Sequence, residues 1–169
     1  MLGYYLEKES LIEFTEKAFH YFDHTTNNLT DELLDWKSCP EANTVRNILG
    51  HLFVEWYGVL PKVLSGITVD EEISVLKTRA HKCGYVGIDG KNLEEVRIQL
   101  EGGKRYLFDM FGKLSNDDLA RDLDWFIGKE PVGSYLLVFV KEICHHEGQI
   151  AAIIGLHKRI NENSEIILW

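Results

Sequence analysis

The sequence predicts an all-α protein, a four-helix bundle with a long crossover between its second and third helices. Apolar residues recur at helical spacing in four long segments, each bounded by capping residues or helix breakers. Between the second and third segments lie about 25 weakly patterned residues, too many for a tight helix-to-helix turn. A length of 169 residues, 45% of them hydrophobic, suits one core, so residues 1–169 are expected to form a single domain.

The first helix is expected from about Glu9 to His24, because its apolar residues fall on one face and its charged residues on the other. Thr30 then predicts one capped helical turn before the loop through Cys39 and Pro40. Asn43 or Thr44 caps the second helix, which runs toward Ser65. Pro61 is expected to bend it near its end.

The crossover covers residues 66–91 and contains one candidate short helix, Asp70 to Ala80, followed by a glycine-rich loop. A connection of this length allows the second and third helices to run parallel. Asn92 and Glu95 form a capping pair that opens the third helix. Adjacent glycines in its middle, Gly102 and Gly103, each cost about 1 kcal/mol relative to alanine and indicate a close approach of two backbones, or a bulky partner.

A capped turn at Ser115 and a briefly alternating stretch over residues 122–128 precede the fourth helix. This helix begins near Pro131 and Ser134 and is expected to last until Lys158 or Arg159. This helix carries the candidate site, because Glu142 and His146 stand on the same stripe as its apolar residues. Two side chains four residues apart are separated by about 6 Å along the axis, so one small ion can touch both. The alternative is a core histidine hydrogen-bonded to a glutamate one turn earlier.

Charge and composition exclude several classes of partner. A net charge of −9, without a local basic patch, predicts that nucleic acid is not a partner. The N-terminus has no signal-like pattern and no apolar run is long enough to span a bilayer, so no membrane association and a cytoplasmic location are expected. The three cysteines, an odd number without paired short spacing, fit a reducing compartment.

Two motifs resemble the DinB/YfiT-like superfamily of small bacterial metal-binding helical bundles. Residues 44–52, Thr-Val-Arg-Asn-Ile-Leu-Gly-His-Leu, are similar to the opening of that family's second helix with its histidine. Residues 145–150, His-His-Glu-Gly-Gln-Ile, are similar to its His-His-x-Gly-Gln signature. The order of the four helices agrees as well, so the likeness covers essentially the whole chain. It implies a metal site built from His51, Glu142 and His146.

Glu142 departs from the family pattern, which places a histidine there. A His-Glu-His set nevertheless resembles the zinc site of the mycothiol-dependent maleylpyruvate isomerase branch, and such a set leaves one position for water or a sulfur. The resemblance therefore implies one divalent metal ion, zinc or nickel, although iron and manganese also accept nitrogen and oxygen ligands. It also implies a homodimer, and the apolar terminal residues 166–169 either meet such a second subunit or fold back on the bundle.

Several neighbouring residues are assigned other roles. His145 is rotated about 100° from His146 and is expected to orient or cap something nearby. Glu55 could accept a hydrogen bond from His51, act as a fourth ligand or form a surface ion pair. Gln149 and Gly148 are expected to pack the fourth helix against a neighbour, and Cys144 to be a small buried hydrophobe. The remaining histidines have no partner at metal spacing and are expected to be solvated: His20, His24, His81 and His157.

Two functional classes follow from the resemblance. The first is an enzyme, a thiol-dependent transferase or isomerase in which the metal activates a low-molecular-weight thiol such as bacillithiol or mycothiol toward an electrophile. The second is a non-catalytic, stress-associated metal-binding bundle. An open cleft around the ion favours the enzyme, and a site closed by four protein ligands favours the structural role.

Overall fold

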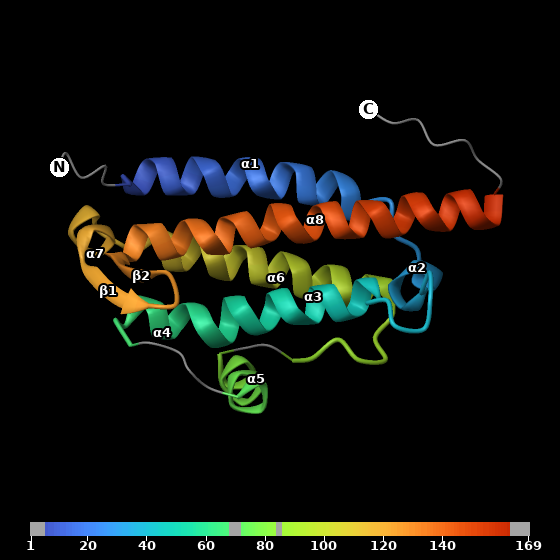
Figure 1. Ribbon diagram of the computed structural model, residues 1–169, viewed down its shortest axis with the longest axis horizontal. Coiled ribbons are helices and arrows are strands. Elements are labelled where there is room, and N and C mark those ends of the chain that lie inside the picture. The colour runs from blue at the N-terminus through green and yellow to red at the C-terminus, as the bar shows by residue number, and fades with distance from the viewer. Residues whose placement is uncertain (1–5, 68–71, 84–85, 163–169) are drawn as a thin grey trace.

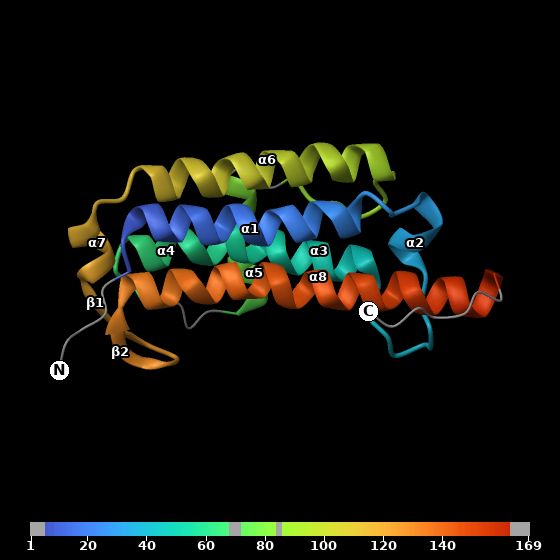
Figure 2. The same cartoon turned by 90° about the horizontal axis from the view of Figure 1, so that it is seen from above.

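Four long helical segments lie side by side in the computed structural model, which describes residues 6–67, 72–83 and 86–162 (Figures 1 and 2). The predicted all-α four-helix bundle is confirmed. Its four segments are α1 (Lys8–Thr26); α3 (Val45–Val54) with its continuations η1 (Glu55–Val59) and α4 (Leu60–Leu64); α6 (Leu93–Gly112); and α8 (Val132–Glu162). Apolar side chains from all four segments form one buried cluster between them.

Several of the helices begin where a capping side chain can satisfy free N–H groups of the first turn. Thr44, rather than Asn43, caps α3: its hydroxyl accepts from the Asn47 N–H, and the Asn47 side chain accepts from the Thr44 N–H. Asn92 and Glu95 form the same reciprocal box at α6, as predicted. The short helices α2 (Asp31–Asp35) and α7 (Asn116–Ala120) are capped by Thr30 and Ser115.

The crossover between the second and third segments also matches the prediction. Following the colour gradient in Figure 1, α3 and α4 run in the same direction as α6, and the chain returns between them through α5 (Ile73–Lys82). The predicted start of this helix at Asp70 lies outside the described residues. Helix α5 packs on η1, where an added Cβ at Gly58 would lie 2.7 Å from the Leu76 carbonyl oxygen. A side chain at Gly58 would therefore push the crossover helix away.

The second segment contains a π-helical turn where a bend at Pro61 is predicted. The Leu60 N–H bonds to the Glu55 carbonyl, five residues earlier. Pro61 has no N–H for the carbonyl of Tyr57, four residues before it, and a π-turn lets the helix pass this point without ending. The turn begins one helical turn after His51, at Glu55.

The close approach predicted at Gly102 and Gly103 involves a side chain and not a second backbone. A Cβ at Gly103 would lie 2.8 Å from Cε3 of Trp56, whose indole is fully buried. The glycine is thus required because the indole lies directly against α6 at this position. The prediction of two approaching backbones is wrong, whereas the bulky partner is present.

A small antiparallel hairpin precedes α8. Strands β1 (Asp122–Trp125) and β2 (Gly128–Pro131) pair with Trp125 opposite Gly128. The buried Tyr135 ties this hairpin to the first turn of α8, because its hydroxyl accepts from the Trp125 N–H at 2.9 Å and donates to the Gly128 carbonyl. The start of α8 is therefore anchored.

Helix α8 ends at Glu162, a few residues beyond the predicted end. The apolar residues 166–169, which support the predicted homodimer, lie outside the described residues, and the homodimer stays a prediction. Within the described part of the chain, every helix is too short or too polar to cross a membrane.

Candidate metal centre

The structure brings the three predicted ligands together. His51 extends from α3, and Glu142 and His146 extend from α8 one turn apart. One ligand atom from each residue lies within 4.8 Å of the other two. The two imidazole rings are 5.0 Å apart between centroids and inclined at 75°. The pairing of the second and fourth segments therefore turns three residues that are distant in sequence into one polar cluster.

The cluster lies at the edge of the core rather than inside it. The His146 side chain is 9% exposed, that of Glu142 is 21% exposed and that of His51 is 46% exposed. Glu142 and His146, predicted on the apolar stripe of α8, are the two less exposed members, whereas His51 stands at the flank of its apolar stripe and is half-exposed. One side of the cluster is consequently open to solvent.

His146 is held in a defined orientation by Gln149. Nδ1 of His146 donates to Oε1 of Gln149 at 2.8 Å, and the Gln149 amide nitrogen in turn donates to Nε2 of His145 at 3.0 Å. Burial lowers the pKa of His146, so the neutral imidazole is favoured. With its proton on Nδ1, the ring directs the lone pair of Nε2 toward Glu142 and His51.

The nitrogen that faces the cluster lacks a hydrogen bond. Nε2 of His146 is buried and has no hydrogen-bond partner among the described residues. Its distance of 3.6 Å from Oε2 of Glu142 is too long for a hydrogen bond, which argues against a simple core pair of these two side chains. An orphaned imidazole nitrogen next to a carboxylate and a second imidazole is a donor set that fits a divalent cation.

Glu55 lies next to the cluster and contacts His51. Its Oε1 is 3.2 Å from Nε2 of His51, and this hydrogen bond raises the pKa of His51. Its Oε2 is buried without a hydrogen-bond partner in the described part of the chain. The Glu55 side chain is only 20% exposed, and of the roles considered from the sequence the structure shows the acceptor of a hydrogen bond from His51.

Sequence reasoning missed the role of Gln149 and misplaced two neighbours. The sequence predicts a packing role for Gln149, but in the structure this side chain accepts a hydrogen bond from His146. Their spacing of three residues, which makes two helical side chains neighbours, is the pattern that could have indicated the contact. An added Cβ at Gly148 would meet no atom within 4 Å, so this glycine does not pack against a neighbouring helix. Cys144 is exposed rather than buried, because position 144 falls on the outer face of α8.

His157 is buried, contrary to the prediction that it is solvated. Its Nε2 lies 3.1 Å from Oε1 of Glu32, and its ring contacts that of Trp36 at 5.2 Å between centroids. The pattern of α8 alone could not show this, because both partners come from the region around α2. His157 therefore has a structural partner away from the candidate metal centre.

The second and fourth segments of the bundle together supply two histidines and a carboxylate. The fold and this cluster indicate a metal-binding class of helical bundle protein. The chain belongs to the DinB superfamily, whose family model matches residues 15–150. This confirms the resemblance found in the two sequence motifs. No curated protein matches the sequence.

Two solved structures are similar in fold. The colibactin self-resistance protein ClbS, crystallised in complex with a dsDNA, matches with a TM-score of 0.63 and 18% identity over 86% of this chain and 94% of its own. A protein from Streptococcus pneumoniae matches with a TM-score of 0.55 and 19% identity over 95% of each chain. At these identities the likeness shows the fold.

The prediction that nucleic acid is not a partner is wrong. It rested on the net charge of −9, yet a protein with this fold has been crystallised with double-stranded DNA. Net charge is a sum over the whole chain, whereas contacts with phosphates depend on the charges at one surface. A negative total therefore cannot exclude such a partner.

Proposed function

We propose that this protein is a metal-dependent enzyme of the DinB superfamily, a thiol-dependent transferase or isomerase. His51, Glu142 and His146 would hold one divalent ion, zinc or nickel. The observation that carries the proposal is the buried, unpartnered Nε2 of His146, which faces a carboxylate and a second imidazole. Three protein ligands of this kind leave one coordination position for a further molecule.

The surrounding residues support a catalytic role over a non-catalytic metal-binding role. When bound, a divalent ion lowers the pKa of a coordinated thiol and so supplies a thiolate at neutral pH. Gln149 keeps His146 in the tautomer with a free Nε2, and half-exposed His51 leaves one side of the cluster accessible to a small thiol. Glu55 accepts a hydrogen bond from His51 through Oε1 and so helps to orient that imidazole.

The alternative is a non-catalytic, stress-associated protein that binds a metal without turnover. It requires a closed site with four protein ligands, and Glu55 is the residue that could provide the fourth. The described cluster contains three residues, with Glu55 outside it, which favours the enzyme.

Adding a low-molecular-weight thiol to the cobalt-substituted protein is expected to produce a new sulfur-to-metal absorption band. The thiol would take the open coordination position as thiolate. Bacillithiol and mycothiol are the probes, and their S-methylated forms are the matched controls, because they keep the size of the molecule but cannot form a thiolate. If neither free thiol changes the spectrum, the non-catalytic alternative moves ahead.

Double-stranded DNA gives a second candidate function, a protein that acts at a duplex. The observation that favours it is the dsDNA in the crystal of ClbS, which shares the fold. Titration of a fluorescent duplex, followed by anisotropy at low and at physiological salt, tests it. Affinity that falls steeply with salt would indicate phosphate contacts. Unchanged anisotropy at all salt concentrations would remove this candidate.

A further inference from the structure

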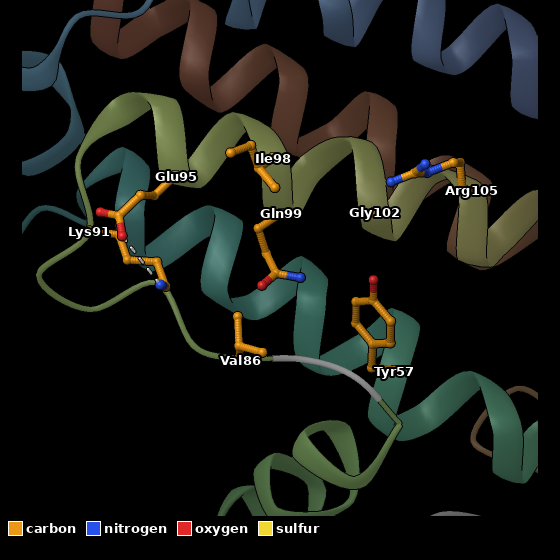
Figure 3. Close-up of a pocket in the computed structure, with 8 residues that line it drawn as sticks. All are labelled: Tyr57, Val86, Lys91, Glu95, Ile98, Gln99, Gly102 and Arg105. Carbon is orange, nitrogen blue, oxygen red and sulfur yellow. Dashed lines mark ion pairs between the residues drawn. The ribbon is translucent and has the colours of Figure 1, made fainter.

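A pocket lies between η1, α6 and residues 86–91, which precede α6 (Figure 3). Its volume of about 450 Å³ is within the range of small-molecule sites. No residue of the His51, Glu142 and His146 cluster lines it, and α8 does not contribute to it. The pocket is therefore separate from the candidate metal centre, and nothing in the proposed function uses it.

The base of this pocket is polar although it is buried. Tyr57 and Gln99 line it, both are buried, and their side chains are hydrogen-bonded to each other. Figure 3 shows the Tyr57 hydroxyl pointing toward α6 near Gly102. An added Cβ at Gly102 would lie 3.7 Å from that hydroxyl, so the glycine leaves the space above the phenol open. A phenol and an amide at the base can orient a polar group of a ligand.

The two ends of the pocket differ in charge. At one end Lys91 pairs with Glu95, their charged atoms 3.7 Å apart, so this end is close to neutral. At the other end Arg105 lines the pocket, and its guanidinium takes part in no ion pair with any described residue. A guanidinium that lines a pocket and pairs with no described carboxylate is available to an acidic group of a ligand.

The wall of the pocket adds an apolar surface. Ile98 and Val86 line it and are both exposed. Tyr57 contributes its ring, which contacts the ring of Tyr106 at 4.5 Å between centroids and is thereby held in place. Exposed aliphatic side chains at the rim of a pocket with a polar base are typical of sites that cover the apolar body of a ligand.

We infer that this pocket binds a small organic anion with a flat apolar body. Its acidic group would lie at Arg105, and its body would lie between Ile98 and Val86, above the base formed by Tyr57 and Gln99. Binding at this site needs no metal, so the inference is independent of the proposed function.

The test compares 2-naphthoate with 2-naphthylmethanol, two probes of similar shape of which only the first is an anion. Binding to the full-length protein is followed by amide NMR, using the signals of Gly102, Gly103 and the Gln99 side-chain amide. We expect 2-naphthoate to shift these signals with at least about tenfold higher affinity than the alcohol, the lower end of what one hydrogen bond to a charged group contributes. Removing metal with a chelator should leave the affinity for each of the two probes unchanged.

Three variants locate the site. Arg105→Gln should weaken the binding of 2-naphthoate at least about tenfold and leave that of 2-naphthylmethanol unchanged, because it removes only the cation. Gly102→Leu should weaken the binding of both probes, because the leucine side chain would enter the space over Tyr57. Thermal unfolding of this variant checks that it is folded. Arg97→Gln is the matched control: it lies on the same helix outside the pocket, where Nη2 of Arg97 donates to the Asn27 carbonyl at 3.4 Å.

The inference is overturned if the Gly102 and Gln99 signals do not respond to 2-naphthoate. It is also overturned if Arg97→Gln weakens binding as much as Arg105→Gln, since the effect would then report overall charge. Equal affinity for the anion and the alcohol would show an apolar site without selection for acids and would refute the assignment to Arg105.

Discussion

Replacing His146 with alanine is expected to weaken metal binding at least about 100-fold, because a site with three protein ligands retains only two. His146 is the most buried of the three ligands, and its orphaned Nε2 is the atom that the fold provides to the ion. The measurement is a competition titration of apo-protein, purified without an affinity tag, against a chromophoric chelator. Elemental analysis of the same preparation identifies the metal.

The matched control is His20→Ala, because His20 is exposed on α1 and does not belong to the cluster. His157→Ala, which the sequence favours as a control, is unsuitable because His157 is buried against Glu32 and Trp36. Gln149→Ala should weaken metal binding by an intermediate factor, about 10-fold or more. It removes the hydrogen bond that fixes the tautomer and orientation of His146 but removes no ligand. Unchanged affinity in His146→Ala would refute the proposed metal site.

Replacing Trp56 with alanine is expected to lower the free energy of unfolding by about 3–5 kcal/mol, the usual cost of removing a buried aromatic side chain. The indole is fully buried and contacts the rings of Phe19 and Phe53 at 5.7 and 5.6 Å between centroids. It also fills the space that Gly103 leaves on α6. Urea denaturation followed by far-ultraviolet circular dichroism measures the change.

A double-mutant cycle separates the contact with Gly103 from general loss of packing. Gly103→Val alone should destabilise, since its Cβ would lie 2.8 Å from the indole. In the Trp56→Ala background the same substitution should cost less or stabilise, because the space is then empty. Phe14→Ala, which removes an exposed ring from α1, should change stability by less than about 0.5 kcal/mol. Strictly additive effects of Trp56→Ala and Gly103→Val would contradict the packing described here.

Much of the fold could be predicted because it depends on local patterns. The caps at Thr44, Asn92 and Ser115 are formed within three residues of each helix start, so the chain needs no tertiary contact to specify them. The helical spacing of apolar residues placed the four long segments, and the length of the stretch between the second and third predicted the crossover. The same periodicity put Glu142 and His146 on one stripe of α8.

What the sequence by itself determined, then, was the set of helices, their caps, their order and the residue types that could bind a metal. The tertiary structure decided which of those side chains meet. The distance between His51 and α8, the burial of His157 against Glu32, and the indole of Trp56 against Gly103 all depend on how separate helices pack. Helical periodicity specifies the direction of a side chain from its own axis, but not the neighbour it encounters, because that neighbour comes from another part of the chain.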